Sequence, residues 1–120
     1  MKSVIGPIMD ITDVTGVMVF NSQADKIAEA FHDPADRKQA NQHNWKPFLQ
    51  SLQGIIEADL LFERKRIYFK KGAGGCLLVL MESHAPAAMV RLSCEAVLAA
   101  IAPPKTLKSK ARRWLKRKRP

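Results

Sequence analysis

The chain has 120 residues, of which 47% are apolar, and a formal net charge of +9. This length suits one compact domain and is too short for two. The apolar fraction argues against global disorder. The apolar run at residues 76–81, like every other apolar run in the sequence, is far shorter than the roughly 20 residues that span a bilayer.

The positive charge is concentrated at one end of the chain. Residues 105–120 hold nine Lys and Arg and no acidic residue, whereas residues 1–104 hold eleven basic and eleven acidic residues. We therefore expect a domain over residues 1–104 and a basic tail over 105–120, either an amphipathic helix or disordered. The neutral domain and the cationic tail need separate functional explanations.

The N-terminus and the cysteines indicate the compartment. The chain turns acidic within its first ten residues and lacks the apolar core of a signal peptide. Cys76 and Cys94 are then expected to be free thiols in a reducing environment. The sequence therefore predicts a cytoplasmic protein.

The first part of the chain predicts a short helix and a hairpin. Gly6-Pro7 restricts the N-terminal helix to about residues 7–13. Residues 16–20 form a short apolar run with β-branched and aromatic residues. Residues 26–31 follow with an alternating pattern, so the two segments predict a hairpin. The polar residues 32–43 are expected to form a loop or the exposed first turn of a helix.

A central helix is predicted from Asn44 onward. Asn44 suits an N-cap, Pro47 suits the first turn, and Gly54 is expected to mark the helix end. The apolar residues at helical spacing are Phe48, Leu49, Leu52, Ile55 and Ile56.

The second half predicts three strands and a last helix. Residues 58–64 and 66–71 predict a second hairpin, and residues 76–81, all apolar, predict a central strand covered on both faces. An apolar stripe beginning near Pro86 predicts a helix that Pro103-Pro104 ends; its members are Val90, Cys94, Val97, Leu98 and Ile101. We therefore predict an α+β fold in which a five-stranded antiparallel sheet is sandwiched between helices.

Five segments carry a pattern that is found in one protein family. They are Val14–Phe20 (VTGVMVF), Phe48–Gln53 (FLQSLQ), Ala58–Glu63 (ADLLFE), Arg66–Phe69 (RIYF) and Leu77–Met81 (LLVLM). In this order they resemble the Roadblock family, the dynein light chain type of domain that also occurs as bacterial and archaeal partners of small GTPases. The resemblance spans roughly residues 10–102 and implies a Roadblock/profilin-like fold.

Three features depart from the family pattern. Ala24-Asp25 and Arg64-Lys65 stand where the family usually has Asp-Gly and Asn-Gly turns, so we expect the second turn to be longer or strained. The N-terminal helix is unusually short. We expect this to leave one face of the sheet partly uncovered, available to a partner or to the tail.

The resemblance implies a dimer, with homodimer and heterodimer both open. Family members pair through the edge strand, here residues 58–64, and through the central helix. An exposed strand carrying Leu60, Leu61 and Phe62 would otherwise favour aggregation, which is an independent argument for pairing. The dimer contacts that we expect are Phe48, Leu52, Leu60 and Phe62.

No catalytic, metal or cofactor site is predicted. The glycines at 72, 74 and 75 lack the downstream lysine of a P-loop and precede a strand, so we expect a hairpin turn there. The histidines and cysteines lack the spacing of metal ligands or of a catalytic Cys–His pair. The basic run Arg64-Lys65-Arg66 is expected to be a charged turn that discourages association, with a tip that approaches a GTPase as the alternative.

The tail matches several anionic partners. Leu107, Ala111, Trp114 and Leu115 lie at helical spacing among cations, which suits an anionic membrane surface, and the indole favours the lipid interface. Nucleic acid, an acidic groove on a protein, and a disordered solubilising tail are the alternatives. The residues expected to bind the anionic partner are Lys105, Lys108, Lys110, Arg112, Arg113, Trp114, Lys116, Arg117, Lys118 and Arg119.

Together these observations predict a dimeric adaptor, not an enzyme, that binds or regulates a small Ras-like GTPase. The tail would attach it to an anionic surface, which makes the protein peripheral at the membrane if that surface is lipid. The alternative is a nucleic-acid-binding protein that uses the fold as a dimerisation module.

Overall fold

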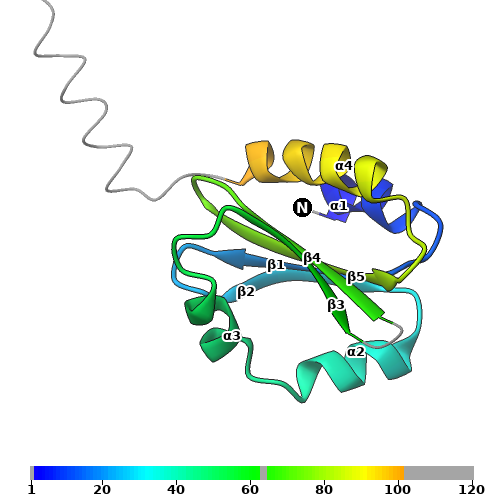
Figure 1. Cartoon of the computed structure of the whole chain (residues 1–120), viewed down its shortest axis with the longest axis horizontal. Coiled ribbons are helices and arrows are strands. Elements are labelled where there is room, and N and C mark those ends of the chain that lie inside the picture. The colour runs from blue at the N-terminus through cyan, green and yellow to red at the C-terminus, as the bar shows by residue number, and fades with distance from the viewer. Residues whose placement is uncertain (1, 63–64, 102–120) are drawn as a thin grey trace, which may run out of the picture.

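The computed structural model describes residues 2–62 and 65–101 and has an α+β fold with three layers (Figure 1). Its elements are α1 (Lys2–Met9), β1 (Val14–Asn21), β2 (Lys26–Phe31), α2 (Pro34–Asn41), α3 (Trp45–Ser51), β3 (Glu57–Phe62), β4 (Lys65–Lys71), β5 (Gly75–Glu82) and α4 (Ala87–Ala100). The five strands form one antiparallel sheet in the order β2-β1-β5-β4-β3. The helices α1 and α4 cover one face, here called the upper face, and α2 and α3 lie across the other, the lower face (Figure 1). The predicted fold class is confirmed.

The strand β5 is central and buried on both faces, as its uninterrupted apolar sequence predicts. It pairs with β1 on one side and with β4 on the other. Leu77 and Val79 belong to the core under α1 and α4, whereas Cys76 and Leu78 belong to the core on the lower face. Because adjacent side chains of a strand point to opposite faces, β5 contributes to both cores along its length.

The two cores differ in size, and this difference shapes the molecule. The upper core contains sixteen buried residues and the lower core seven. No residue of α3 itself is fully buried, and α2 buries only Ala40. The lower layer therefore covers the sheet less completely than the upper layer does.

The prediction of an N-terminal helix over residues 7–13 is wrong. The helix α1 runs from Lys2 to Met9 and has Pro7 inside it. Ile5, Ile8 and Met9 lie at helical spacing and are buried against the sheet and α4, so packing outweighs the one backbone hydrogen bond that proline removes.

Residues 32–43 also contain more helix than predicted, because α2 occupies Pro34–Asn41. The side chain of Asp33 caps it by accepting a hydrogen bond from the backbone N–H of Ala35 at 2.9 Å. The next helix, α3, begins where predicted, and Asn44 caps it through the N–H of Lys46 at 3.2 Å. Asp33 followed by Pro34 is therefore a helix-start signal in the sequence, with an N-cap residue before a proline at the first helical position.

The partly open face of the sheet is the lower one, so our explanation from a short N-terminal helix is wrong. The helices α1 and α4 pack together and cover the upper face, while the short α2 and α3 leave room below. The β3–β4 turn at residues 63–64 and the predicted tail, residues 105–120, lie outside the described residues. The predicted domain boundary at residue 104 therefore stays a prediction.

Two glycine substitutions test the packing of the sheet. A Cβ atom at Gly75, which pairs with Asn21 of β1, would lie 2.0 Å from the backbone oxygen of Phe20. We expect Gly75→Ala to lower the free energy of unfolding by about 2 kcal/mol or more, since a backbone atom cannot rotate away. Chemical denaturation monitored by circular dichroism measures this change.

Gly6→Ala is the matched control. A Cβ atom at Gly6, inside α1, would meet nothing within 4 Å. Alanine favours a helix over glycine, so this variant is expected to gain about 0.5–1 kcal/mol. Equal stabilities of the two variants would contradict the packing described for β1 and β5.

Candidate protein-interaction surface

The strand β3 forms one edge of the sheet and leaves a row of backbone groups available. It pairs with β4 from Glu57–Lys70 to Phe62–Lys65 and with no other strand of the described chain. At the opposite edge, β2 has α1 and α2 packed against it. An unpaired edge is a template for another strand, and β3 is the edge that is less covered by helices.

Exposed apolar side chains cluster at this edge. Leu61 is 68% exposed and Phe62 is 48% exposed, and Ile56 just before the strand is also exposed. Leu60 is half-buried on the lower face, in register with Ile67 of β4. Large apolar side chains beside unpaired backbone groups are typical of a surface that another protein covers.

A groove of about 420 Å³ on the lower face continues from this edge. Phe62 of β3 and Phe48 of α3 both line it. Trp45 packs against Phe48 edge-to-face, with 5.6 Å between the ring centroids, and its indole N–H donates to the backbone oxygen of Ala40 at 3.0 Å. The groove therefore has aromatic walls, one of which is held in place by a hydrogen bond.

The four predicted dimer contacts lie in different environments. Phe48 and Phe62 line the groove, and Leu60 lies on the same face of the sheet. Leu52 is buried in the lower core and offers almost no surface to a partner. Leu61, which is not one of the four predicted contacts, is among the more exposed residues of the edge. Three consecutive apolar residues in a strand indicate that both faces of the strand carry an apolar side chain.

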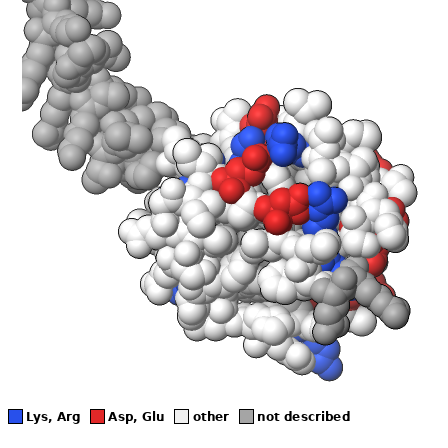
Figure 2. Space-filling model, in the orientation of Figure 1, with Lys and Arg blue, Asp and Glu red and all other residues white. Residues whose placement is uncertain are grey.

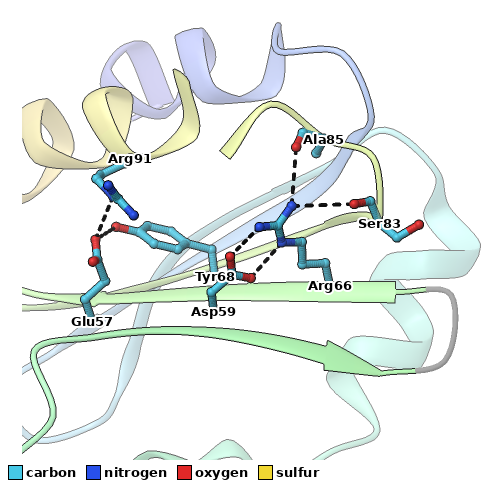
Figure 3. A network of polar contacts seen from close by, with 7 residues as sticks. All are labelled: Glu57, Asp59, Arg66, Tyr68, Ser83, Ala85 and Arg91. Carbon is cyan, nitrogen blue, oxygen red and sulfur yellow. Dashed lines mark hydrogen bonds and ion pairs between the residues drawn. The ribbon is translucent and has the colours of Figure 1, made fainter. Parts of the chain in front are cut away.

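On the upper face, β3 is held by ion pairs that lie beneath α4 (Figure 3). The carboxylate of Glu57 accepts a hydrogen bond from the Tyr68 hydroxyl and lies 3.0 Å from Nε of Arg91. Lys70 lies 3.7 Å from Glu57 and 3.1 Å from Glu95. Figure 2 shows acidic and basic side chains side by side on this surface.

A second ion pair ties β3 to β4. Nε of Arg66 donates to Oδ1 of Asp59 at 2.7 Å, and a second guanidinium nitrogen contacts Oδ2. The remaining nitrogen points at the backbone oxygens of Ser83 and Ala85, each 3.5 Å away (Figure 3). The pair therefore links the edge strand to the loop that leads into α4.

These contacts keep the carboxylates charged. The Tyr68 hydroxyl, with Arg91 and Lys70, lowers the pKa of Glu57, and the Arg66 guanidinium lowers the pKa of Asp59. Burial, together with the bond to Glu57, raises the pKa of Tyr68. Carboxylates with lowered pKa values and several donors serve structure better than proton transfer.

The prediction of a basic hairpin tip is partly wrong. Lys65 and Arg66 belong to β4, and they pair with Glu82, at 2.8 Å, and with Asp59. They are strand residues with acidic partners, not free charges at a turn.

The described residues offer little chemistry beyond these contacts. Burial raises the pKa of Cys76 to about 11 and that of Cys94 to about 12, so both are neutral thiols at physiological pH. Within residues 2–62 and 65–101, no group of three or more His, Cys, Asp or Glu side chains could hold a metal ion, and no helix is long and apolar enough to cross a membrane.

The predicted anion-binding residues all lie outside the described part of the chain. They are Lys105, Lys108, Lys110, Arg112, Arg113, Trp114, Lys116, Arg117, Lys118 and Arg119. Their role stays a prediction.

The fold is that of solved Roadblock structures. A Roadblock/LC7 domain from Streptomyces avermitilis superposes with a TM-score of 0.62 at 15% identity, covering 84% of this chain and 93% of the other. MglB in a tetrameric arrangement gives 0.56 at 18% identity over 83% of each chain. The gliding protein MglB of Thermus thermophilus gives 0.55 at 17% identity, covering 82% and 86%. No protein-family model and no curated protein matches the sequence.

The pH dependence of stability tests the Asp59–Arg66 pair. Because the folded-state pKa of Asp59 lies below its ordinary value of 3.8, the pair stabilises the fold at neutral pH and is lost as the pH falls through the folded-state pKa. We expect Asp59→Asn to lower stability at pH 7 by up to about 1 kcal/mol, since the pair is partly exposed, and to lose less on acidification than the wild type.

Urea unfolding between neutral and acidic pH measures both curves. Arg66→Gln should reproduce the flatter curve of Asp59→Asn, because it removes the same pair from the other side. Parallel curves for all three proteins would show that the pair contributes nothing to stability.

Proposed function

We propose that this chain is an adaptor that dimerises through β3 and binds a small Ras-like GTPase without catalytic groups of its own. The observation that carries the proposal is the unpaired edge strand, with exposed Leu61 and Phe62, that continues into the aromatic groove. The Roadblock fold, which the resemblance associates with dimers and with small GTPases, supports both parts of it.

Dimerisation would proceed by antiparallel pairing of β3 with β3 of a second copy. A twofold axis perpendicular to the sheet joins two five-stranded sheets into one and keeps both upper faces on the same side. The pairing satisfies the free backbone groups of β3 and removes Leu61 and Phe62 from water. Burial of such a side chain contributes about 1–2 kcal/mol.

The ion pairs of the upper face reduce the repulsion between two copies of β3. Glu57 and Asp59 would bring like charges together when two copies of β3 meet, which is unfavourable across strands. Each acid already has a cation within its own protomer, Arg91 for Glu57 and Arg66 for Asp59. The two edges can therefore approach with little net repulsion.

The GTPase would bind the lower face of the joined sheet. There each protomer supplies a groove with aromatic walls, lined by Phe48 and Phe62, beside the dimer axis. A protein that binds one of two conformations of a GTPase more tightly shifts their populations by that difference in affinity. Such regulation needs a complementary surface and no proton-transfer group.

The dimer is tested by placing charge at the edge. We expect Leu61→Glu/Phe62→Glu to raise the dimer dissociation constant at least about 100-fold, because two acids on each protomer would be buried in the interface without a cation. Sedimentation equilibrium measures the constant, and a thermal midpoint close to that of the wild type shows that the protomer still folds.

Leu92→Glu is the matched control, since Leu92 of α4 has the same 68% exposure as Leu61 and lies away from β3. This variant should dimerise like the wild type. A monomeric wild type, or a dimer that only a change at Ile27 of β2 disrupts, would overturn the proposed interface.

GTPase binding is tested with small GTPases from the same source, loaded with GDP or with a non-hydrolysable GTP analogue. We expect the full chain to bind one nucleotide state at least about tenfold more tightly than the other, as population shift requires. Isothermal titration calorimetry measures both affinities. Leu61→Glu/Phe62→Glu should weaken binding and Leu92→Glu should not; no binding in either state would contradict this function.

A further inference from the structure

The helix α4 presents apolar side chains to solvent as well as to the core. Val90, Cys94 and Val97 are buried against the sheet. On the outward side, Met89 is 56% exposed and Leu92 is 68% exposed. The other exposed apolar residues of the helix are Ala88, Ala96, Ala99 and Ala100.

These six residues form a continuous apolar face. At about 100° per residue they fall within an arc of about 120° that contains no polar side chain. The polar residues of α4 are Arg91, Ser93 and Glu95, all of which lie outside the arc. Arg91 points toward β3, where it pairs with Glu57 (Figure 3). Glu95 pairs with Lys70 of β4. A helix that is apolar on nearly all sides is normally covered on all sides.

The chain that follows α4 supplies charge that this surface lacks. The ion pairs beside α4 balance, with Glu57, Asp59 and Glu95 against Arg66, Lys70 and Arg91. The basic tail begins four residues after Ile101 and holds nine Lys and Arg, no acid, and Trp114. An apolar helix face and a strongly cationic segment are therefore neighbours in the chain.

We propose that the outward face of α4 and the basic tail together bind the surface of an anionic lipid bilayer. Met89 and Leu92 enter the interface between headgroups and acyl chains, and the tail cations contact the headgroup phosphates and carboxylates. Two weak signals of this kind, apolar and cationic, are the usual requirement for stable attachment. The binding needs only this face and the tail, so it does not depend on the proposed GTPase.

A second copy of the chain fits this face less well. A helix of 14 residues is about 21 Å long, and an apolar strip about 10 Å wide covers only about 200 Å². A stable protein interface buries about 800 Å² on each partner. A bilayer sets no such minimum, because each tail cation adds on the order of 1 kcal/mol.

Nucleic acid explains the tail but not the helix. Phosphate contacts would use the cations and leave Met89 and Leu92 in water. The proposed dimer, by contrast, adds to membrane binding, because its axis keeps both α4 helices on one side of the joined sheet. One flat surface then meets two apolar faces at once.

The test uses the full chain and vesicles of phosphatidylcholine with or without about one third phosphatidylglycerol. We expect co-sedimentation with the anionic vesicles and little with the neutral ones. Met89→Gln/Leu92→Gln should weaken the binding about tenfold, because two apolar side chains lose their transfer to the interface. Both positions are exposed, so the thermal midpoint should stay close to that of the wild type.

Two further variants complete the design. Ile27→Gln, at an exposed residue of β2, the edge strand opposite β3, should bind vesicles like the wild type. Lys116→Glu/Arg117→Glu/Lys118→Glu/Arg119→Glu should abolish the preference for anionic lipid and the sensitivity of binding to salt.

Three outcomes would overturn the inference. Equal vesicle binding by the wild type and Met89→Gln/Leu92→Gln would show that α4 takes no part. Loss of an oligomer in that double variant would show that the face binds a second copy. Salt-sensitive binding to duplex DNA without vesicle binding would assign the tail to nucleic acid. Because no GTPase is present in these assays, a negative result would not bear on the proposed GTPase binding.

Discussion

Burial of β5 on both faces is the constraint on which the rest of the structure depends. A strand that is apolar at nearly every position must lie between two strands and between two layers of helices. The upper layer meets this demand fully, since α1 and α4 bury Ile5, Ile8 and Val97 against the sheet. The lower layer is built from two short helices that bury far less. Because these helices cover the lower face only in part, a groove remains there and the edge strand β3 stays exposed.

The sequence predicts elements well where their residues alone determine the burial. The strand β5 and the buried stripe of α4 are such cases, because every position of the pattern is apolar. The sequence does not predict α1 correctly, because contacts with the distant helix α4 outweigh the hydrogen bond that Pro7 removes. It does not predict α2 either, because α2 buries Ala40 alone and has no apolar stripe. For α1 the missing information lies in tertiary packing, and for α2 the start signal is the Asp33 cap followed by Pro34.

The candidate surface was predictable only in outline. Consecutive apolar residues at 60–62 indicate a strand that binds another protein or aggregates, but the register with β4 determines which of their side chains are covered. Leu60 is half-buried because Ile67 lies beside it in β4, whereas Leu61 has the charged Arg66 as its neighbour and stays exposed. Leu52 is among the predicted dimer contacts, but it caps the C-terminal end of α3 and is buried in the lower core. Such differences depend on register, which the composition of a strand does not specify.

The acidic side chains of β3 are balanced by ion pairs, so they do not oppose the proposed dimer or the proposed lipid contact. Each acid of β3 is neutralised inside its own protomer, by Arg91, Lys70 or Arg66, and so neither edge-to-edge pairing nor an approach to the upper face meets a large uncompensated charge there. The whole net charge of the chain then resides in residues 105–120. An attraction that acts through the tail can therefore position the domain without disturbing the ion pairs that hold its edge strand. The proposed contact with a second protomer and the proposed contact with a lipid surface therefore rest on different charges, and neither excludes the other.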